Sequence, residues 1–287
     1  MQKIFSILGI ALFLFSCTTP VQEKQENKKE NKRIVSLSGT LTEIIYALHA
    51  EKELVGVDVT STYPEQTAKL TNLGHIRMVS AEGILGLNPT HVIGFKDEFN
   101  PTLVEQLKKA NIEVVLFDRE FSVAGAKQVI RDCAKWLDQQ VAGETLTTKI
   151  DTDVKAVEKL AAKPAVLFIY ARGAGTLMVA GDDSQFKSMI ELAGGKNAVT
   201  GFVDFKPLTT ESVVAANPDV LLMFDSGANS LNGEGGIFAV PGVSMTTAGK
   251  QKNLITMDGQ LLSGFGPRVG EALLLLNKEF KKLAAQQ

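Results

Sequence analysis

Two stretches of the chain carry the same pattern, and this repeat decides the fold: SAEGILGLNPTHVIGF at residues 80–95 and TTESVVAANPDVLLMF at residues 209–224. They align without a gap at an offset of 129 residues, so that a glutamate, an Asn-Pro pair and a final phenylalanine recur in register. In each copy a Ser or Thr precedes a helical run, the Asn-Pro pair ends the helix, and the apolar run predicts a buried strand. A unit that occurs twice indicates two homologous lobes.

Short apolar runs around both copies predict further strands, with helices between them. The strands are expected at 34–37, 54–57, 112–117, 165–170 and 253–257, and helices at 42–50 and 101–110. The run at 165–170 echoes 34–37, and the run at 253–257 echoes 111–115. Alternation of buried strands with helices is typical of a parallel sheet covered on both faces. We therefore predict an α/β fold of two Rossmann-like lobes with parallel sheets.

A helix is expected to join the two lobes. Residues 145–162 carry an apolar stripe of helical period, bounded by Gly143 and Pro164. A helix of this length rises roughly 27 Å, enough to cross from one lobe to the other and to hold them stiffly. The expected division is an N-terminal lobe at 33–142, a spanning helix at 143–163 and a C-terminal lobe at 164–287, with the ligand in the cleft between the lobes.

The N-terminus is typical of an exported protein. Lys3 precedes an apolar run at residues 4–15, which is too short to span a bilayer. The run ends in LFSC at 14–17, similar to a bacterial lipobox, which implies that residues 1–16 are removed and that Cys17 is lipidated. A plain secretory signal is the alternative. Residues 17–32 are rich in Gln, Glu, Asn and Lys, which predicts a flexible tether after the lipid anchor.

Composition excludes several classes of protein. The 287 residues include 32 acidic and 30 basic side chains, so no positive excess favours nucleic acid as a partner. Two cysteines and three histidines leave little material for a zinc site, and the helical apolar spacing around Cys133 predicts a core residue. The glycines at 172–176 are followed by another strand, so they predict a hairpin and not a dinucleotide-binding turn. No catalytic constellation is apparent, so an enzyme on a two-lobed scaffold is the weaker alternative to a binding protein.

Several further motifs occur in the order that a known family shows. They are RIVSL at 33–37, STYP at 61–64, GHIR at 74–77, SAEG at 80–83, FKPL at 205–208 and GFGPR at 264–268. Together they resemble the haem-binding proteins of bacterial haem-uptake ABC transporters, within the rigid two-lobed superfamily shared with cobalamin and siderophore binders. The resemblance implies a non-enzymatic protein that captures haem (hemin) and delivers it to a permease dimer with its ATPase subunits. Haem would be the cargo, with no catalytic cofactor.

The resemblance also implies a compartment and a runner-up ligand. The protein is expected to work outside the cytoplasmic membrane, in the periplasm of a Gram-negative cell, and the lipobox-like segment predicts that a lipid on Cys17 holds it at the outer side of that membrane. Cobalamin or an iron-siderophore is the alternative cargo, because the relatives that bind these ligands share the lobe plan.

The resemblance implies that Tyr63 is the axial ligand of ferric haem. A phenolate oxygen is a hard donor that suits Fe(III), and Tyr63 lies in a polar loop where a core role is not expected. A tyrosine that caps the loop by hydrogen bonding is the alternative. His75 is a weaker candidate for the second axial position, whereas His49 and His91 are expected to be structural.

Other residues are candidates for the rest of the haem. Arg77 and Arg268, and less strongly Lys206, could bind the two propionates, because guanidinium grips carboxylates in a bidentate way. Solvated surface charge is the alternative for all three. Phe205 and Phe265 could pack on the porphyrin plane, or each could close a small core.

Glu82 and Glu211 occupy the same place in the two copies of the repeat, at the first turn of a helix. The resemblance implies that they dock the protein on the two permease subunits. A carboxylate that complements the helix dipole is the alternative.

Overall fold

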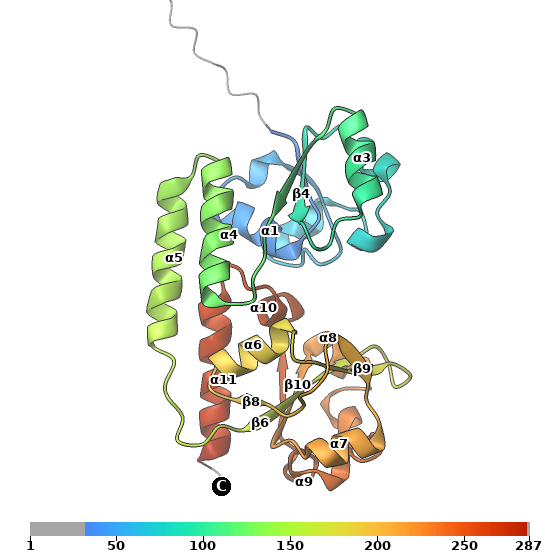
Figure 1. Cartoon of the computed structure of the whole chain (residues 1–287), viewed down its shortest axis with the longest axis vertical. Helices are drawn as coiled ribbons and strands as arrows, with labels where there is room; N and C mark the ends of the chain where they lie inside the picture. The colour runs from blue at the N-terminus through green and yellow to red at the C-terminus, as the bar shows by residue number, and fades with distance from the viewer. Residues whose placement is uncertain (1–31, 286–287) are drawn as a thin grey trace, which may run out of the picture. The chain divides into compact units, whose positions relative to one another are not determined.

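The computed structural model describes residues 32–285, which form two β-sheets with helices packed against them (Figure 1). The predictions for the export signal, for Cys17 and for the tether lie outside the described residues, except at Lys32. The predicted α/β class is confirmed.

The first sheet is entirely parallel. Its strands are β1 (Ile34–Ser36), β2 (Leu54–Val57), β3 (Thr71–Asn72), β4 (His91–Phe95) and β5 (Glu113–Phe117). They lie in the order β3-β2-β1-β4-β5. The helices of this lobe are α1 (Gly39–Ala47), α2 (Ala81–Leu85), α3 (Pro101–Lys109) and α4 (Val123–Trp136), with 3-10 turns η1 (Glu51–Glu53), η2 (Glu65–Lys69) and η3 (Ile76–Met78).

The second sheet is mixed, which differs from the prediction of a parallel sheet. Its strands are β6 (Ala165–Ala171), β7 (Leu177–Ala180), β8 (Lys196–Asn197), β9 (Phe205–Pro207), β10 (Val220–Phe224) and β11 (Leu254–Met257). The order is β11-β10-β6-β7-β9, with β8 also paired to β6. β7 runs antiparallel to both β6 and β9, because residues 172–176 form the predicted hairpin and return the chain directly.

Helices also surround the second sheet. They are α6 (Gln185–Leu192), α7 (Thr210–Ala216), α8 (Asp225–Asn229), α9 (Thr247–Gln251), α10 (Gly259–Ser263) and α11 (Val269–Ala284), with 3-10 turns η4 (Glu234–Ala239) and η5 (Val243–Met245).

The repeat is visible in the strand register. Val92 pairs with Val35 on β1, and Leu221, its equivalent in the second copy, pairs with Leu167 on β6. On the other side Val92 faces Val114, whereas Leu221 faces Leu254. Leu254 is therefore equivalent to Val114 and not to Ile112, so the expected echo of 253–257 with 111–115 was wrong by two residues. An even shift keeps every side chain on its face of the sheet, which is why the apolar pattern did not reveal it.

The spanning helix exists, but its bounds differ from the prediction. α5 runs from Gln140 to Lys155 and packs against α4 of the first lobe and α11 of the second (Figure 1). Gly143 lies inside the helix, where a Cβ would come within 2.5 Å of Ala134 Cβ, so the glycine permits close packing on α4 and does not mark a boundary.

The helix ends seven residues before Ala162 because a side chain of α11 replaces its hydrogen bonds. Asn277 accepts from the N–H of Glu158 and donates to the carbonyl of Glu158, at 3.1 and 2.8 Å. Val157 and Leu160, which extended the predicted stripe, still pack on the core from this non-helical segment. The apolar period of the sequence therefore predicted correctly that these two residues pack against the core, but not that they lie outside the helix.

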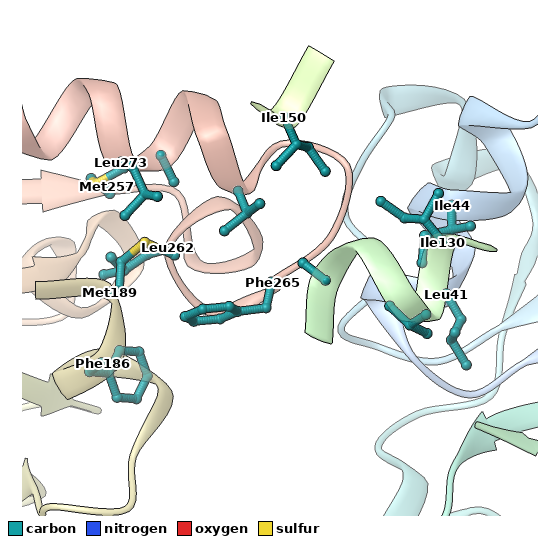
Figure 2. Close-up of a cluster of buried hydrophobic side chains, with 14 of the residues drawn as sticks. Leu41, Ile44, Ile130, Ile150, Phe186, Met189, Met257, Leu262, Phe265 and Leu273 are labelled. Atoms are coloured by element: carbon teal, nitrogen blue, oxygen red, sulfur yellow. The ribbon is translucent and has the colours of Figure 1, made fainter. Parts of the chain in front are cut away.

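One buried apolar cluster extends through both lobes. Figure 2 shows Leu41, Ile44 and Ile130 from the first lobe, and Met189 and Leu262 from the second. Cys133 belongs to the same cluster and is 1% exposed, which confirms its predicted core role, and burial raises the pKa of its thiol well above the ordinary value. A shared core favours a fixed arrangement of the two lobes.

Candidate functional site

Tyr63 lies at the end of a loop that follows β2. The loop begins at Asp58, which is 1% exposed and accepts hydrogen bonds from the hydroxyls of Thr60 and Ser61 at 2.7 and 2.8 Å. Ser61 is also hydrogen-bonded to Thr42 of α1 at 2.8 Å. Burial raises the pKa of Asp58, and the two hydroxyl donors oppose that shift. These bonds anchor the loop to the first lobe, and the Tyr63–Pro64 peptide that closes it is cis.

The side chain of Tyr63 is 42% exposed, so it is not a core residue. Its hydroxyl has no hydrogen-bond partner among residues 32–285, which leaves the loop-capping alternative without a bond there. The guanidinium carbon of Arg268 lies 3.5 Å from the centroid of its ring, a cation–π geometry.

Arg268 is held in place by a buried carboxylate. Its Nε and a terminal nitrogen donate to the two carboxylate oxygens of Glu43 at 3.0 and 2.8 Å, and the two side chains are 16% and 6% exposed. Burial raises the pKa of Glu43, and Arg268 and Gln260 oppose that shift. Glu43 occupies the edge of the guanidinium formed by Nε and Nη2, so a propionate could meet Arg268 only at its remaining edge, and that role stays a prediction.

A cavity of about 670 Å³ adjoins this group. Besides Tyr63, Arg268 and Glu43 it is lined by residues of α1, η2, α5 and the start of α11, including Tyr46, His49, Lys69, Leu146, Lys149 and Glu271. Its volume falls within the range of about 300–1,000 Å³ that small-molecule sites occupy. His49, which we expected to be structural, lines the cavity with a left-handed φ of 59°.

Arg77 and Lys206 are exposed and do not line this cavity. Arg77 lies in η3, where its backbone N–H donates to Nδ1 of His75 at 3.3 Å, so His75 caps the turn. Lys206 lies on the edge strand β9 with its amine 4.7 Å from the centroid of the Phe202 ring. The structure does not bring either cation to Tyr63.

The two phenylalanines differ. Phe265 is 2% exposed and contacts Phe121 with ring centroids 5.6 Å apart, so it closes the core between the lobes (Figure 2). This burial favours the alternative prediction, that Phe265 closes a core, over the prediction that it packs on a porphyrin. Phe205 is 40% exposed at the edge of an aromatic cluster.

That cluster was not predicted as a group. Tyr170 and Phe186 lie 6.3 and 6.1 Å from Phe205, and Phe224 lies 6.3 Å from Tyr170 and 5.6 Å from Phe186 between ring centroids. Tyr170 and Phe224 lie on predicted buried strands, whereas Phe186 lies on helix α6. Their convergence on an exposed ring depends on the pairing of β6 with β7 and of β7 with β9, which no single segment encodes.

Glu82 and Glu211 occupy equivalent exposed positions. Each lies in the first turn of its helix, α2 or α7, after a Ser or Thr whose side chain caps that helix. The two glutamates are therefore equivalent in the structure as well as in the sequence.

Two negative findings concern the described part of the chain. Within residues 32–285, no helix is both long and apolar enough to cross a bilayer. The same residues contain no cluster of three or more His, Cys, Asp or Glu side chains that could hold a metal ion.

Comparisons with known proteins give the class. Residues 34–261 match the model of the periplasmic binding protein family, and the chain belongs to that family. It is thus a substrate-binding protein of the ABC transporter type, as the motifs predicted.

Individual relatives agree. The periplasmic heme-binding protein RhuT from Roseiflexus sp. RS-1, in apo form, is 41% identical and superposes with a TM-score of 0.84 over 88% of this chain and 99% of that chain. The periplasmic heme-binding protein BhuT in complex with two hemes is 34% identical, with a TM-score of 0.82 over 88% and 99% of the two chains. The uncharacterized ABC transporter substrate-binding lipoprotein YvrC of Bacillus subtilis strain 168 is 26% identical over 253 residues, 86% of this chain and 79% of YvrC.

Proposed function

We propose that this protein captures haem outside the cytoplasmic membrane and delivers it to the permease of an ABC transporter. The observation that carries the proposal is Tyr63, a half-exposed phenol that lines a 670 Å³ cavity in a family of substrate-binding proteins. The similarity to RhuT and BhuT, both described as heme-binding, supports this ligand.

Tyr63 supplies the iron ligand. Its phenolate oxygen is a hard anionic donor for ferric iron. Arg268, stacked 3.5 Å from the ring centroid, places a positive charge beside the anion that forms when the phenol binds iron. Because Asp58 already fixes the loop, little ordering of Tyr63 is required on binding, which favours affinity.

The remaining candidates act at the periphery. Arg77 and Lys206 are exposed, so both are accessible to propionates that reach the surface. Phe205, with Tyr170 beside it, offers an apolar face to the porphyrin. Arg268 serves Tyr63 in this scheme, and the buried Phe265 takes no direct part.

A hemin titration tests the proposal. Purified protein should form a 1:1 complex with a perturbed Soret band and a tyrosinate-to-iron charge-transfer band. Tyr63→Phe should remove the charge-transfer band and weaken binding at least about tenfold, since even the outer partners of metal ligands are worth 10–100-fold. Binding should not vanish, because the cavity and the arginines remain.

Tyr46→Phe is the matched control, because Tyr46 lines the same cavity but is not expected to touch iron. An unchanged spectrum in Tyr63→Phe would contradict the assignment of the ligand. Tight binding of cobalamin or a siderophore without a hemin complex would replace haem as the cargo, since a corrinoid receptor needs no phenolate on its metal.

Anchoring and delivery complete the proposal. Lipidation of Cys17 would hold the protein at the outer side of the cytoplasmic membrane, and Cys17→Ser should release it into the soluble fraction. Glu82 and Glu211 would each meet a basic pocket on one of two similar permease subunits, which belong to a transporter powered by its ATPase subunits.

A further inference from the structure

Gln260 links the second lobe to the loop that carries Tyr63. It lies in α10 and is 9% exposed. Its Oε1 accepts from the backbone N–H groups of Thr62 and Tyr63, both at 2.9 Å, and from the Thr62 hydroxyl at 3.0 Å. The position of the loop therefore depends on a side chain that is almost 200 residues away in the sequence.

The other end of the same amide completes a ring of contacts. Nε2 of Gln260 donates to the carbonyl of Gly39 at 2.8 Å and to Glu43 at 3.0 Å. Glu43 holds Arg268, and Arg268 stacks on Tyr63. Tyr63 is thus held at its backbone by Gln260 and at its ring by Arg268, and both of these residues belong to the second lobe.

These contacts differ in range. A hydrogen bond of 2.9 Å is lost when donor and acceptor separate by roughly another 1 Å, whereas a cation–π contact persists to about 6 Å. If the lobes part, the bonds of Gln260 break first and leave two backbone N–H groups of the loop without their partner. The loop then keeps its anchors within the first lobe and the longer-range contact of Arg268 with the Tyr63 ring.

We propose that Gln260 is a positioning residue that makes retention of haem depend on the separation of the two lobes. The inference rests on the proposed binding of haem through Tyr63. A partner that pulls the lobes apart would loosen the iron ligand without touching it, which couples docking to release of the cargo.

The test compares two variants of Gln260 with one control. Gln260→Met keeps the length and removes every hydrogen bond, whereas Gln260→Asn keeps the amide and shortens its reach by one methylene. Thr40→Val is the matched control: Thr40 donates to the carbonyl of Gly264 at 2.7 Å, a bond between the same lobes that does not involve Thr62 or Tyr63. Two readouts apply: the rate of hemin transfer to excess apomyoglobin, and amide hydrogen exchange of the peptide containing Thr62 and Tyr63 in the hemin-free protein.

Both Gln260 variants should release hemin at least about tenfold faster, as loss of a buried hydrogen-bond partner implies, and should exchange faster at Thr62 and Tyr63. Thr40→Val should change release less than about twofold. Unchanged exchange in both variants would overturn the role of Gln260, as would equal acceleration by Thr40→Val. Failure of the wild type to bind hemin would instead overturn the proposed function, and the retention claim with it.

Discussion

The two lobes are alike on one side of their central strand and different on the other. In the first lobe β1 is followed by parallel β4 and β5, and in the second lobe β6 is followed by parallel β10 and β11. Residues that are equivalent in the repeat occupy equivalent positions in the two sheets. On the opposite side β1 is followed by parallel β2 and β3, whereas β6 pairs with the two-residue parallel strand β8 and with antiparallel β7, which in turn pairs with antiparallel β9.

Under the proposed function, this difference would assign docking on the transporter to one side and ligand binding to the other. The shared side includes α2 and α7, which carry Glu82 and Glu211 in equivalent first turns. The divergent side carries Tyr63 after β2 in one lobe and Phe205 on β9 in the other. A transporter with two similar subunits calls for two similar surfaces, whereas a single ligand that needs an iron donor and an apolar wall calls for two different ones.

The largest effect is expected from removing both shared glutamates. Glu82→Ala combined with Glu211→Ala should bind hemin normally yet abolish uptake and stimulation of the transporter ATPase, because rim charges govern docking and not the ligand. Each single variant should cause a similar partial loss if the lobes dock equivalently. Uptake assays and hemin titration measure the two properties separately.

The matched control removes two exposed glutamates that the repeat does not relate. Glu105→Ala with Glu191→Ala changes the net charge equally and should leave uptake intact. Normal uptake in the Glu82/Glu211 variant would assign these residues to helix capping alone.

The next largest effect concerns the contact between the lobes. Arg268→Met leaves the buried carboxylate of Glu43 without its cation and should lower the free energy of unfolding by about 3 kcal/mol, as measured by urea denaturation. Adding Glu43→Gln removes the unpaired charge and should restore part of the loss. A double variant no more stable than Arg268→Met would show that the cost has another origin.

A smaller effect is expected in the pH dependence of stability. Burial raises the pKa of Glu43 in the folded protein above its ordinary value of 4.5. At a pH between the ordinary pKa and the raised pKa, Glu43 therefore binds more protons in the native state than in the unfolded state. The contribution of Glu43 to the free energy of unfolding therefore falls as the pH rises through that window, by at most about 1.4 kcal/mol per pH unit. Glu43→Gln should remove this slope in urea titrations at several pH values. An unchanged difference between the two proteins across the window would contradict the raised pKa.

The smallest effect is expected in the overall dimensions on loading. The apolar cluster extends through both lobes and α5 packs on helices of each, so binding of hemin should leave the lobes where they are. Small-angle scattering of the hemin-free and loaded proteins should superpose. A clear decrease in the dimensions of the protein on loading would contradict this expectation and would show that the lobes close around the ligand by a hinge motion.

Much of the fold and part of the site could be predicted from the sequence. The limits of β2 and the presence of β4 and β10 follow from apolar runs, and Tyr63 and the two glutamates lie in short local motifs. The mixed pairing of β7 and β9 could not be found in this way, because strand direction depends on the path between strands and not on the strand itself. The early end of α5 depends on Asn277, more than 100 residues away.

The sequence by itself determined the two-lobed α/β class, the repeat and the residue types that the proposed chemistry requires, because apolar periodicity and local motifs are properties of short segments. The tertiary structure decided how those residues are used. It paired Arg268 with Glu43 and with the ring of Tyr63, placed Phe265 in the core, and brought Gln260 to the backbone of the Tyr63 loop. Buried polar contacts of this kind depend on which distant segments meet, since a polar group leaves water only where the folded chain supplies its partner.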